Sequence, residues 1–214
     1  MDLEEEAAAY AAADFADVNE AFVERLLELA GPVERVLALD LGTGPADVPL
    51  RLWRRRAGWT IVAADVSRAM LDLARPVLDA GGATRNVWLL QQDAKTSPLK
   101  SGAFDIVFSN SILHHVSDTA RFWTEAARVA RPGSLFFVRD LARPASESAA
   151  AAVVARYAGA ESALLREEFY RSLLSAYTVE EVRAQLAVCG IDWLRVEMSS
   201  DRHLDIYGRD AETC

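Results

Sequence analysis

The stretch ALDLGTGPAD, residues 38–47, places carboxylates and closely spaced glycines directly after an apolar run. Gly42 and Gly44 allow a sharp turn and a close approach to a ligand, because neither carries a Cβ. Asp40 and Asp47 flank this turn with carboxylates, which would repel a pyrophosphate at a helix N-terminus. We therefore expect a ligand that has an adenosine part and a cationic end and that is not bound through phosphate groups.

Two phosphate-binding motifs fail at the same turn. A Rossmann dinucleotide fingerprint requires G-x-G-x-x-G, and Asp47 stands where the third glycine belongs. A P-loop would need a G-K-[ST] sequence, which does not follow Gly44. An NAD(P)-dependent oxidoreductase is therefore an alternative that the turn disfavours.

The elements around this turn alternate between short apolar runs and helical patterns, which is typical of an α/β fold with a parallel, doubly wound sheet. Ser67 is a plausible helix N-cap, and Thr178 with Glu181 forms a T-x-x-E capping box. The last two strands are separated only by SSDRH, so we expect an antiparallel hairpin. The seven expected strands are Arg35–Leu41, Thr60–Val66, Val87–Gln92, Phe104–Ser109, Ser134–Asp140, Trp193–Met198 and Leu204–Gly208.

Two segments lie outside this alternation. Residues 1–30 are Ala-rich and amphipathic, which predicts an N-terminal helical cap. Residues 144–177 form an insertion after the fifth strand, and we expect it to be a helical lid over a site. The length of 214 residues fits a single domain spanning residues 1–214.

The composition bears on partners and location. A net charge of −9 disfavours nucleic acid, since phosphate backbones are bound by clustered Lys and Arg. The basic run RLWRRR, residues 51–56, is expected to be a solvated helix face. No apolar run approaches the length of a membrane span, and the acidic start MDLEEE is unlike a secretory signal, so we expect a cytoplasmic protein. The two cysteines offer neither a disulfide framework nor a metal site.

The sequence resembles the class I S-adenosylmethionine (SAM)-dependent methyltransferases, in the group that contains quinone-biosynthesis and small-molecule methyltransferases. Four stretches carry the resemblance in the order of the family: ALDLGTGPAD, IVAADVSRAML, LLQQDAKTSPLKSGAFDIVFSNSILHH and ARVARPGSLFFVRD. It implies a three-layer Rossmann-like fold, SAM as cofactor, S-adenosylhomocysteine (SAH) as product and a small-molecule acceptor. The methyl group would pass to an O, N or C nucleophile by in-line displacement.

The same resemblance implies roles for individual residues. Asp40 would receive the methionine ammonium, and Asp65 would bind the ribose hydroxyls. Asp93 would accept from the adenine amino group, beside the backbone N–H of Ala94. The other expected cofactor-binding residues are Gly42, Thr43 and Gly44 at the turn, Val66 and Met70 against the adenine, and Asn110 and Ser111 near the methionine end.

His114 and His115 are the candidate catalytic residues, because a histidine near this site can take a proton from an oxygen or nitrogen nucleophile. Adjacent residues point apart, so at most one is expected to act, and methyl transfer can also proceed by alignment alone. Expected acceptor and lid residues include Tyr10, Tyr170 and Arg143, of which Arg143 could instead form a structural salt bridge.

Three questions stay open at this point. A catalytically inert SAM-binding regulatory protein would carry the same cofactor residues. The acceptor and the methylated atom have no sequence pattern to identify them. The chain is expected to be a monomer or a homodimer.

Overall fold

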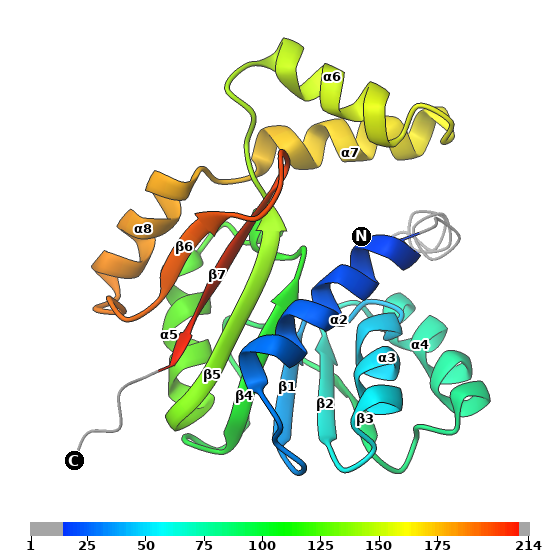
Figure 1. Cartoon of the computed structure of the whole chain (residues 1–214), viewed down its shortest axis with the longest axis vertical. Coiled ribbons are helices and arrows are strands. Elements are labelled where there is room, and N and C mark those ends of the chain that lie inside the picture. Colours follow the sequence, from blue (N-terminus) through cyan, green and yellow to red (C-terminus); the bar gives the residue numbers. More distant parts are fainter. Residues whose placement is uncertain (1–14, 210–214) are drawn as a thin grey trace.

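The computed structural model describes residues 15–209 (Figure 1). Tyr10 lies outside the described residues. One seven-stranded sheet with the order β3-β2-β1-β4-β5-β7-β6 forms the centre of the molecule. All neighbours pair in parallel except β7, which is antiparallel to β5 and β6. The strands are β1 (Leu37–Leu41), β2 (Thr60–Asp65), β3 (Val87–Gln91), β4 (Phe104–Asn110), β5 (Ala130–Leu141), β6 (Arg195–Met198) and β7 (His203–Arg209).

This arrangement confirms the predicted α/β fold and the antiparallel C-terminal hairpin. The described helices are α2 (Ala16–Ala30), α3 (Asp47–Arg55), α4 (Arg68–Gly81), α5 (Thr119–Val129), α6 (Glu147–Tyr157), α7 (Ala163–Ser175), α8 (Val179–Val188) and the 3₁₀ turn η1 (Leu113–His115).

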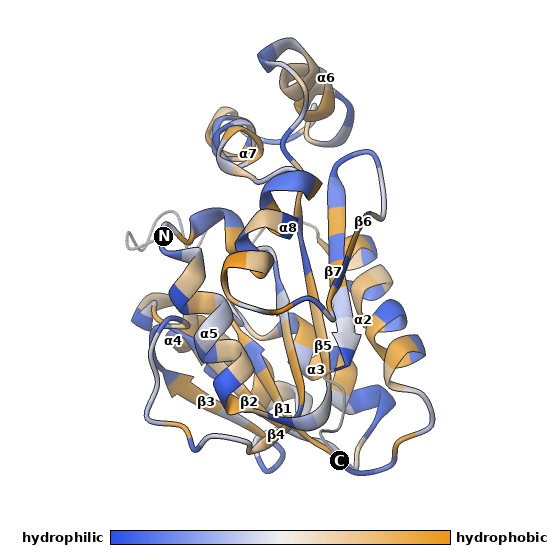
Figure 2. Cartoon of the chain, turned by 90° about the vertical axis from the view of Figure 1, so that its left-hand side faces the viewer, coloured by the Kyte–Doolittle hydropathy of each residue, from blue (hydrophilic) through white to orange (hydrophobic). Residues whose placement is uncertain are grey.

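Three layers result from the alternation of side chains along each buried strand. Ala38 of β1 points into a core shared with α2, α3 and α4, whereas its neighbour Leu39 points into a core shared with α5 and α8. Phe136 and Phe137 of β5 divide in the same way. Much of the central sheet is accordingly coloured hydrophobic in Figure 2.

The prediction was wrong in detail for the fifth strand, which begins at Ala130 rather than Ser134. Its pairing with β4 is irregular, since Phe104 pairs with Ala130 but Ile106 pairs with Leu135. Gly133, with φ of 76°, sits in this irregular stretch. A strand that carries extra residues opposite its partner has no clear period-2 pattern to predict it from.

Helix caps form where the sequence predicts them. The Ser67 side chain accepts from the Met70 N–H at the start of α4. The Thr178 and Glu181 capping box is present at the start of α8. These caps fix where α4 and α8 begin, and the Ser67 cap holds the first turn of α4 next to the end of β2.

Helices α6 and α7 fill the segment predicted as an insertion and stand beyond the carboxyl ends of the parallel strands (Figures 1 and 2). They share a small core of their own, formed by Leu141, Ala150, Val154, Ala158, Leu173 and Ala176. Among the described residues, no helix is long and apolar enough to span a membrane.

Candidate functional site

The turn after β1 has the geometry that its glycines predict. Gly42 has φ of 80° and Gly44 has φ of 55°, both in the left-handed region. A Cβ on Gly42 would lie 2.0 Å from Cγ2 of Ile112, so a larger residue cannot fit without displacing the segment after β4. The Gly42 N–H donates to the Ala64 carbonyl of β2 at 2.8 Å. The turn is therefore held between the ends of two neighbouring strands.

Asp65, the last residue of β2, is fixed by backbone donors. Its Oδ2 accepts from the N–H of Gly44 at 2.8 Å, and its Oδ1 accepts from the N–H of Ser67 at 2.8 Å. Each carboxylate oxygen has a second lone pair left for a ligand. The structure thus brings together the turn and the carboxylate that the sequence places 21 residues apart.

A cavity of about 410 Å³ opens at this edge of the sheet. This volume lies within the range of small-molecule sites, about 300–1,000 Å³. Its walls include eleven of the predicted site residues: Gly42, Gly44, Asp65, Val66, Met70, Asp93, Ala94, Asn110, Ser111, His114 and His115.

Asp40 and Thr43 are not among the residues that line the cavity. Asp40 is only 2% exposed, and burial raises the pKa of its carboxyl to about 8, although the nearby Thr43 hydroxyl offsets part of the rise. The Thr43 hydroxyl itself makes no hydrogen bond of standard geometry with the described residues. Asp40 is therefore a buried carboxyl for which no cationic partner is found among the described residues.

Asp93 and its neighbours occupy the loop after β3. Oδ1 of Asp93 accepts from the N–H and from the ammonium of Lys95, both at 2.9 Å. Partial burial would raise the pKa of Asp93, but these hydrogen bonds outweigh it and hold the pKa below its usual value. The preceding Gln92 also lines the cavity, and its buried Oε1 lacks a partner among the described residues. This loop therefore presents a fixed carboxylate and an unpaired amide oxygen.

Asn110, at the end of β4, connects the sheet to α2. Its Nδ2 donates to Oδ1 of Asn19 at 3.1 Å, and Nδ2 of Asn19 donates to Oδ2 of Asp47 at 2.8 Å. Asn19 and Val18 line the cavity as well. Sequence reasoning missed Asn19, because no spacing signal links a helix residue to a strand end 91 positions away.

The basic run at residues 51–56 is only partly solvated. Arg51 pairs with Asp47 at 2.7 Å and with Glu20 of α2 at 3.0 Å, and Arg55 also pairs with Glu20. The two ion pairs with Glu20 hold α2 against α3.

His114 and His115 follow β4 and differ in environment. His114 is buried, and its Nδ1 lies 2.6 Å from Oδ1 of Asp140. His115 has an exposed face within the cavity, yet the surrounding protein lowers its pKa to about 4 through partial desolvation and the nearby His114. The two rings lie 4.0 Å apart between centroids.

Neither Arg143 nor Tyr170, the two predicted lid residues within the described structure, lines the cavity. Arg143 pairs with Glu181 of α8, which favours the structural salt bridge over a substrate contact. Tyr170 packs in the small core of α6 and α7 and does not line the cavity. The walls on this side instead come from Tyr157, Leu164, Leu165 and Phe169 of the helical insertion and from Arg202 and His203 of the β6–β7 hairpin.

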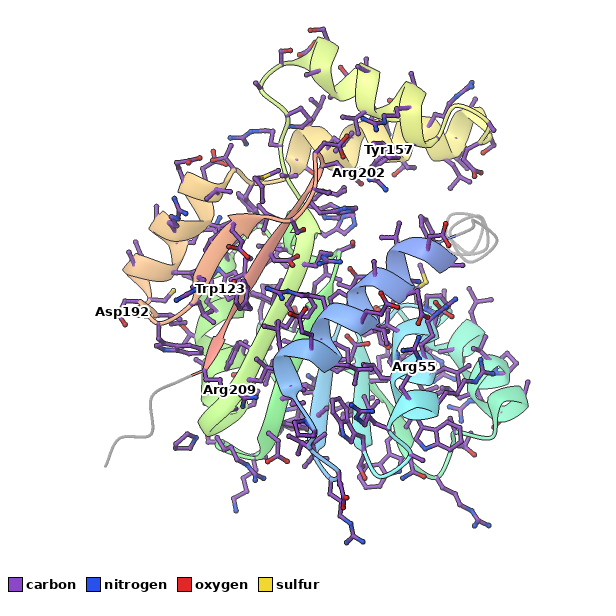
Figure 3. The ribbon with its side chains drawn as sticks, viewed as in Figure 1. Arg55, Trp123, Tyr157, Asp192, Arg202 and Arg209 are labelled. Carbon is purple, nitrogen blue, oxygen red and sulfur yellow. The ribbon has the colours of Figure 1, made fainter. Side chains whose placement is uncertain are left out.

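Two of these wall residues join the insertion to the hairpin. The Arg202 guanidinium lies 3.4 Å from the centre of the Tyr157 ring, and the two side chains meet at the hairpin tip (Figure 3). The Tyr157 hydroxyl donates to the Asp201 carboxylate at 2.8 Å. We call this group of Tyr157, Asp201 and Arg202 the lid contact.

Residues 39–138 match a family model described as a methyltransferase domain. This segment contains the glycine turn, Asp65, Asp93 and Asn110. Over these residues the chain is a member of the methyltransferase-domain family. It is 34% identical over 124 residues to a malonyl-[acyl-carrier protein] O-methyltransferase of Geobacter sulfurreducens, covering 57% of this chain and 45% of that protein. It is 35% identical over 106 residues to a demethylmenaquinone methyltransferase of Thermus thermophilus, covering 50% and 47%.

The fold extends beyond the matched segment. A crystal structure of a SAM-dependent methyltransferase from Aquifex aeolicus superposes with a TM-score of 0.72 at 20% identity, covering 96% of this chain and 97% of that one. The chain spans about half the length of the curated relatives it matches. The similarity to those relatives therefore concerns the methyltransferase domain.

Proposed function

We propose that this methyltransferase transfers the methyl group of SAM to an O, N or C nucleophile of a small molecule. The observation that supports this most is the Gly44–Asp65 hydrogen bond at the wall of the 410 Å³ cavity. This hydrogen bond joins a turn whose glycines lack side chains to a fixed carboxylate, and an adenosyl ligand requires both features.

The residues present fit an adenosyl cofactor with a cationic end. Asp65 offers lone pairs to the ribose hydroxyls, and Val66 and Met70 offer an apolar wall for the adenine. Asp40 has no cationic partner among the described residues, so the methionine ammonium would supply one, directly or through water. Gln92 keeps a polar side-chain atom free for a ligand contact at the cavity wall. Gly42, Asp93, Ala94, Asn110 and Ser111 complete the proposed set.

The bound cofactor supplies an activated methyl group on a sulfonium. The chain contributes alignment and exclusion of water, which can account for much of the rate of a displacement. Where the acceptor carries a proton on its nucleophilic atom, His114 or His115 takes that proton.

The helical insertion shapes the acceptor side of the cavity. Leu164, Leu165 and Phe169 give this wall an apolar character. The two curated relatives are named for different acceptors, a malonyl-[acyl-carrier protein] and a demethylmenaquinone, so the acceptor does not follow from the domain. We propose a small molecule that enters between the insertion and α2, with residues 144–177 acting as the lid.

The remaining parts of the proposal concern the whole protein. Residues 1–214 act as one domain in the cytoplasm, as a monomer or homodimer. The net charge of −9 supports an acceptor other than nucleic acid.

Incorporation of a labelled methyl group tests this function. Purified protein is incubated with methyl-labelled SAM and the small-molecule fraction of a cell extract, and the products are separated. Label in a small organic product supports the proposal. Cofactor binding without any labelled product, in extracts from several growth conditions, would favour the inert SAM-binding alternative, and binding of NADH alone would favour an oxidoreductase.

A further inference from the structure

The carboxylate of Asp140, near the end of β5, stands in an unusual position. It is 2% exposed and receives two backbone donors, the N–H of Leu113 at 2.6 Å and the N–H of Leu141 at 2.7 Å. Its Oδ1 also lies 2.6 Å from Nδ1 of His114. Both oxygens of this carboxylate accept hydrogen bonds from backbone N–H groups. The contact with His114 is therefore a hydrogen bond if Nδ1 carries a proton and donates it to Oδ1.

That proton fixes the tautomer of His114. In a neutral imidazole one nitrogen donates and the other accepts, so a protonated Nδ1 leaves a lone pair on Nε2. No hydrogen bond to Nε2 of His114 is found among the described residues, and His114 lines the cavity. A histidine oriented by a buried carboxylate is a recurring arrangement for an imidazole that acts as a base.

We propose that Asp140 is a positioning residue that holds His114 with Nε2 free toward the cavity, so that His114 is the general base for an acceptor hydroxyl. This inference rests on the proposed function and extends it to the acceptor class. The acceptor oxygen forms a bond to the methyl carbon while the carbon–sulfur bond breaks. The electron pair of the carbon–sulfur bond stays on sulfur. The hydroxyl proton passes to Nε2, and the resulting imidazolium is stabilised by the Asp140 carboxylate.

The neighbouring histidines are less suited to this role. His115 and His203 also line the cavity, but burial lowers the pKa of each to about 4. Positive charge from Arg202 and Arg139 adds to the effect at His203. Neither has a carboxylate within hydrogen-bond distance of its ring in the described structure, whereas His114 has one at 2.6 Å. The structure therefore separates His114 from the other two.

Nitrogen-15 NMR of the histidine rings tests the proposal without an acceptor. The chain has three histidines, and His115→Asn and His203→Asn assign their signals by deletion. For His114 at neutral pH we expect a protonated Nδ1 and an unprotonated Nε2, in the free protein and with SAH. A protonated Nε2 in the wild type would overturn the proposal.

Asp140→Asn is the decisive variant, with Asp118→Asn as an exposed control that keeps its helix-capping ability. We expect the Asp140 variant to move the His114 proton toward Nε2 and the control to leave it unchanged. An unchanged His114 tautomer in folded Asp140→Asn protein would contradict the positioning role. If that variant does not fold, the wild-type tautomer still decides. SAH titration of the same samples tests the proposed function separately, because cofactor binding does not depend on the His114 tautomer.

Discussion

The Oδ2 atom of Asp65 accepts a hydrogen bond from the backbone N–H of Gly44 at 2.8 Å, which joins the ends of two neighbouring strands. The carboxylate cannot rotate freely, since its other oxygen is held by the N–H of Ser67. A ligand that binds both the turn and the carboxylate therefore meets groups that are already ordered. This preorganisation lowers the entropy lost on binding.

Gly42→Ala should destabilise the protein. The backbone at residue 42 has φ of 80°. A Cβ added there would lie 2.0 Å from Cγ2 of Ile112. Left-handed strain alone costs about 1–2 kcal/mol, and the clash adds to it. Gly102→Ala, with φ of 64° and open space around its Cβ, carries the strain alone. Thermal unfolding should show a larger loss for Gly42→Ala than for Gly102→Ala, and equal losses would contradict the packing argument.

Cofactor affinity should rise with pH up to about 8, because the Asp40 carboxyl has a pKa of about 8 and must ionise to attract an ammonium. Below that pH, each unit should weaken SAH binding by up to about tenfold. Calorimetry in buffers of different ionisation enthalpy should detect proton release on binding. Asp40→Asn should abolish this pH dependence.

The same pKa predicts the stability of the protein without cofactor. The folded state holds the Asp40 proton more tightly than the unfolded chain, since the pKa rises from 3.8 to about 8. This contribution is fully present at pH below 3.8 and is lost as pH rises toward 8. Asp40→Asn should flatten the pH dependence of the unfolding free energy between these limits, and an unchanged slope would contradict the assignment.

Loss of the lid contact should loosen the helical insertion. Tyr157→Phe removes the hydrogen bond to Asp201 but keeps the ring below Arg202, and Asp201→Ala also removes the 3.1 Å ion pair with Arg156. Hydrogen exchange in α6 and α7 should increase more for Asp201→Ala than for Tyr157→Phe. Arg171→Ala, which breaks the two exposed ion pairs with Glu167 and Glu168 within α7, is the control. Exchange rates equal to the control would show that the contact does not hold the lid.

Asn19→Ala should weaken cofactor binding although Asn19 lies outside the family motifs. It removes the hydrogen bonds that join α2 to Asn110 and to Asp47. Each such bond contributes about 0.5–1.5 kcal/mol, so SAH affinity should fall by up to about tenfold. Asp17→Ala on the exposed side of the same helix should have little effect. A loss of affinity in both variants would point to helix stability instead.

The sequence predicted the parts of the site that depend on local pattern. The strand ends and the glycine turn follow from apolar periodicity and backbone freedom, so Gly42, Gly44 and Asp65 were found where their spacing places them. Arg143 and Tyr170 were candidates by residue type and approximate position, but the fold gives Arg143 a partner on α8 and packs the partly buried Tyr170 against the core of α6 and α7. Residue type carries no information on such long-range pairing.

Long-range contacts also explain what sequence reasoning could not supply. The contact between His114 and Asp140 joins residues 26 positions apart on different elements. Each residue was visible in the sequence, but only the parallel pairing of β4 with β5 places the end of one strand beside the other. The α2 contribution through Asn19 depends in the same way on packing of the helix across the sheet.

Calorimetric titration with SAH is the most direct test of the cofactor site. Wild-type protein and Asp72→Ala, which loses only an exposed carboxylate of α4, should bind alike. Asp65→Ala loses charged hydrogen bonds at about 1.5–3 kcal/mol each, so its affinity should fall at least about tenfold. NADH should not bind. Binding of NADH in place of SAH, or equal SAH affinity in Asp65→Ala and wild type, would contradict the account.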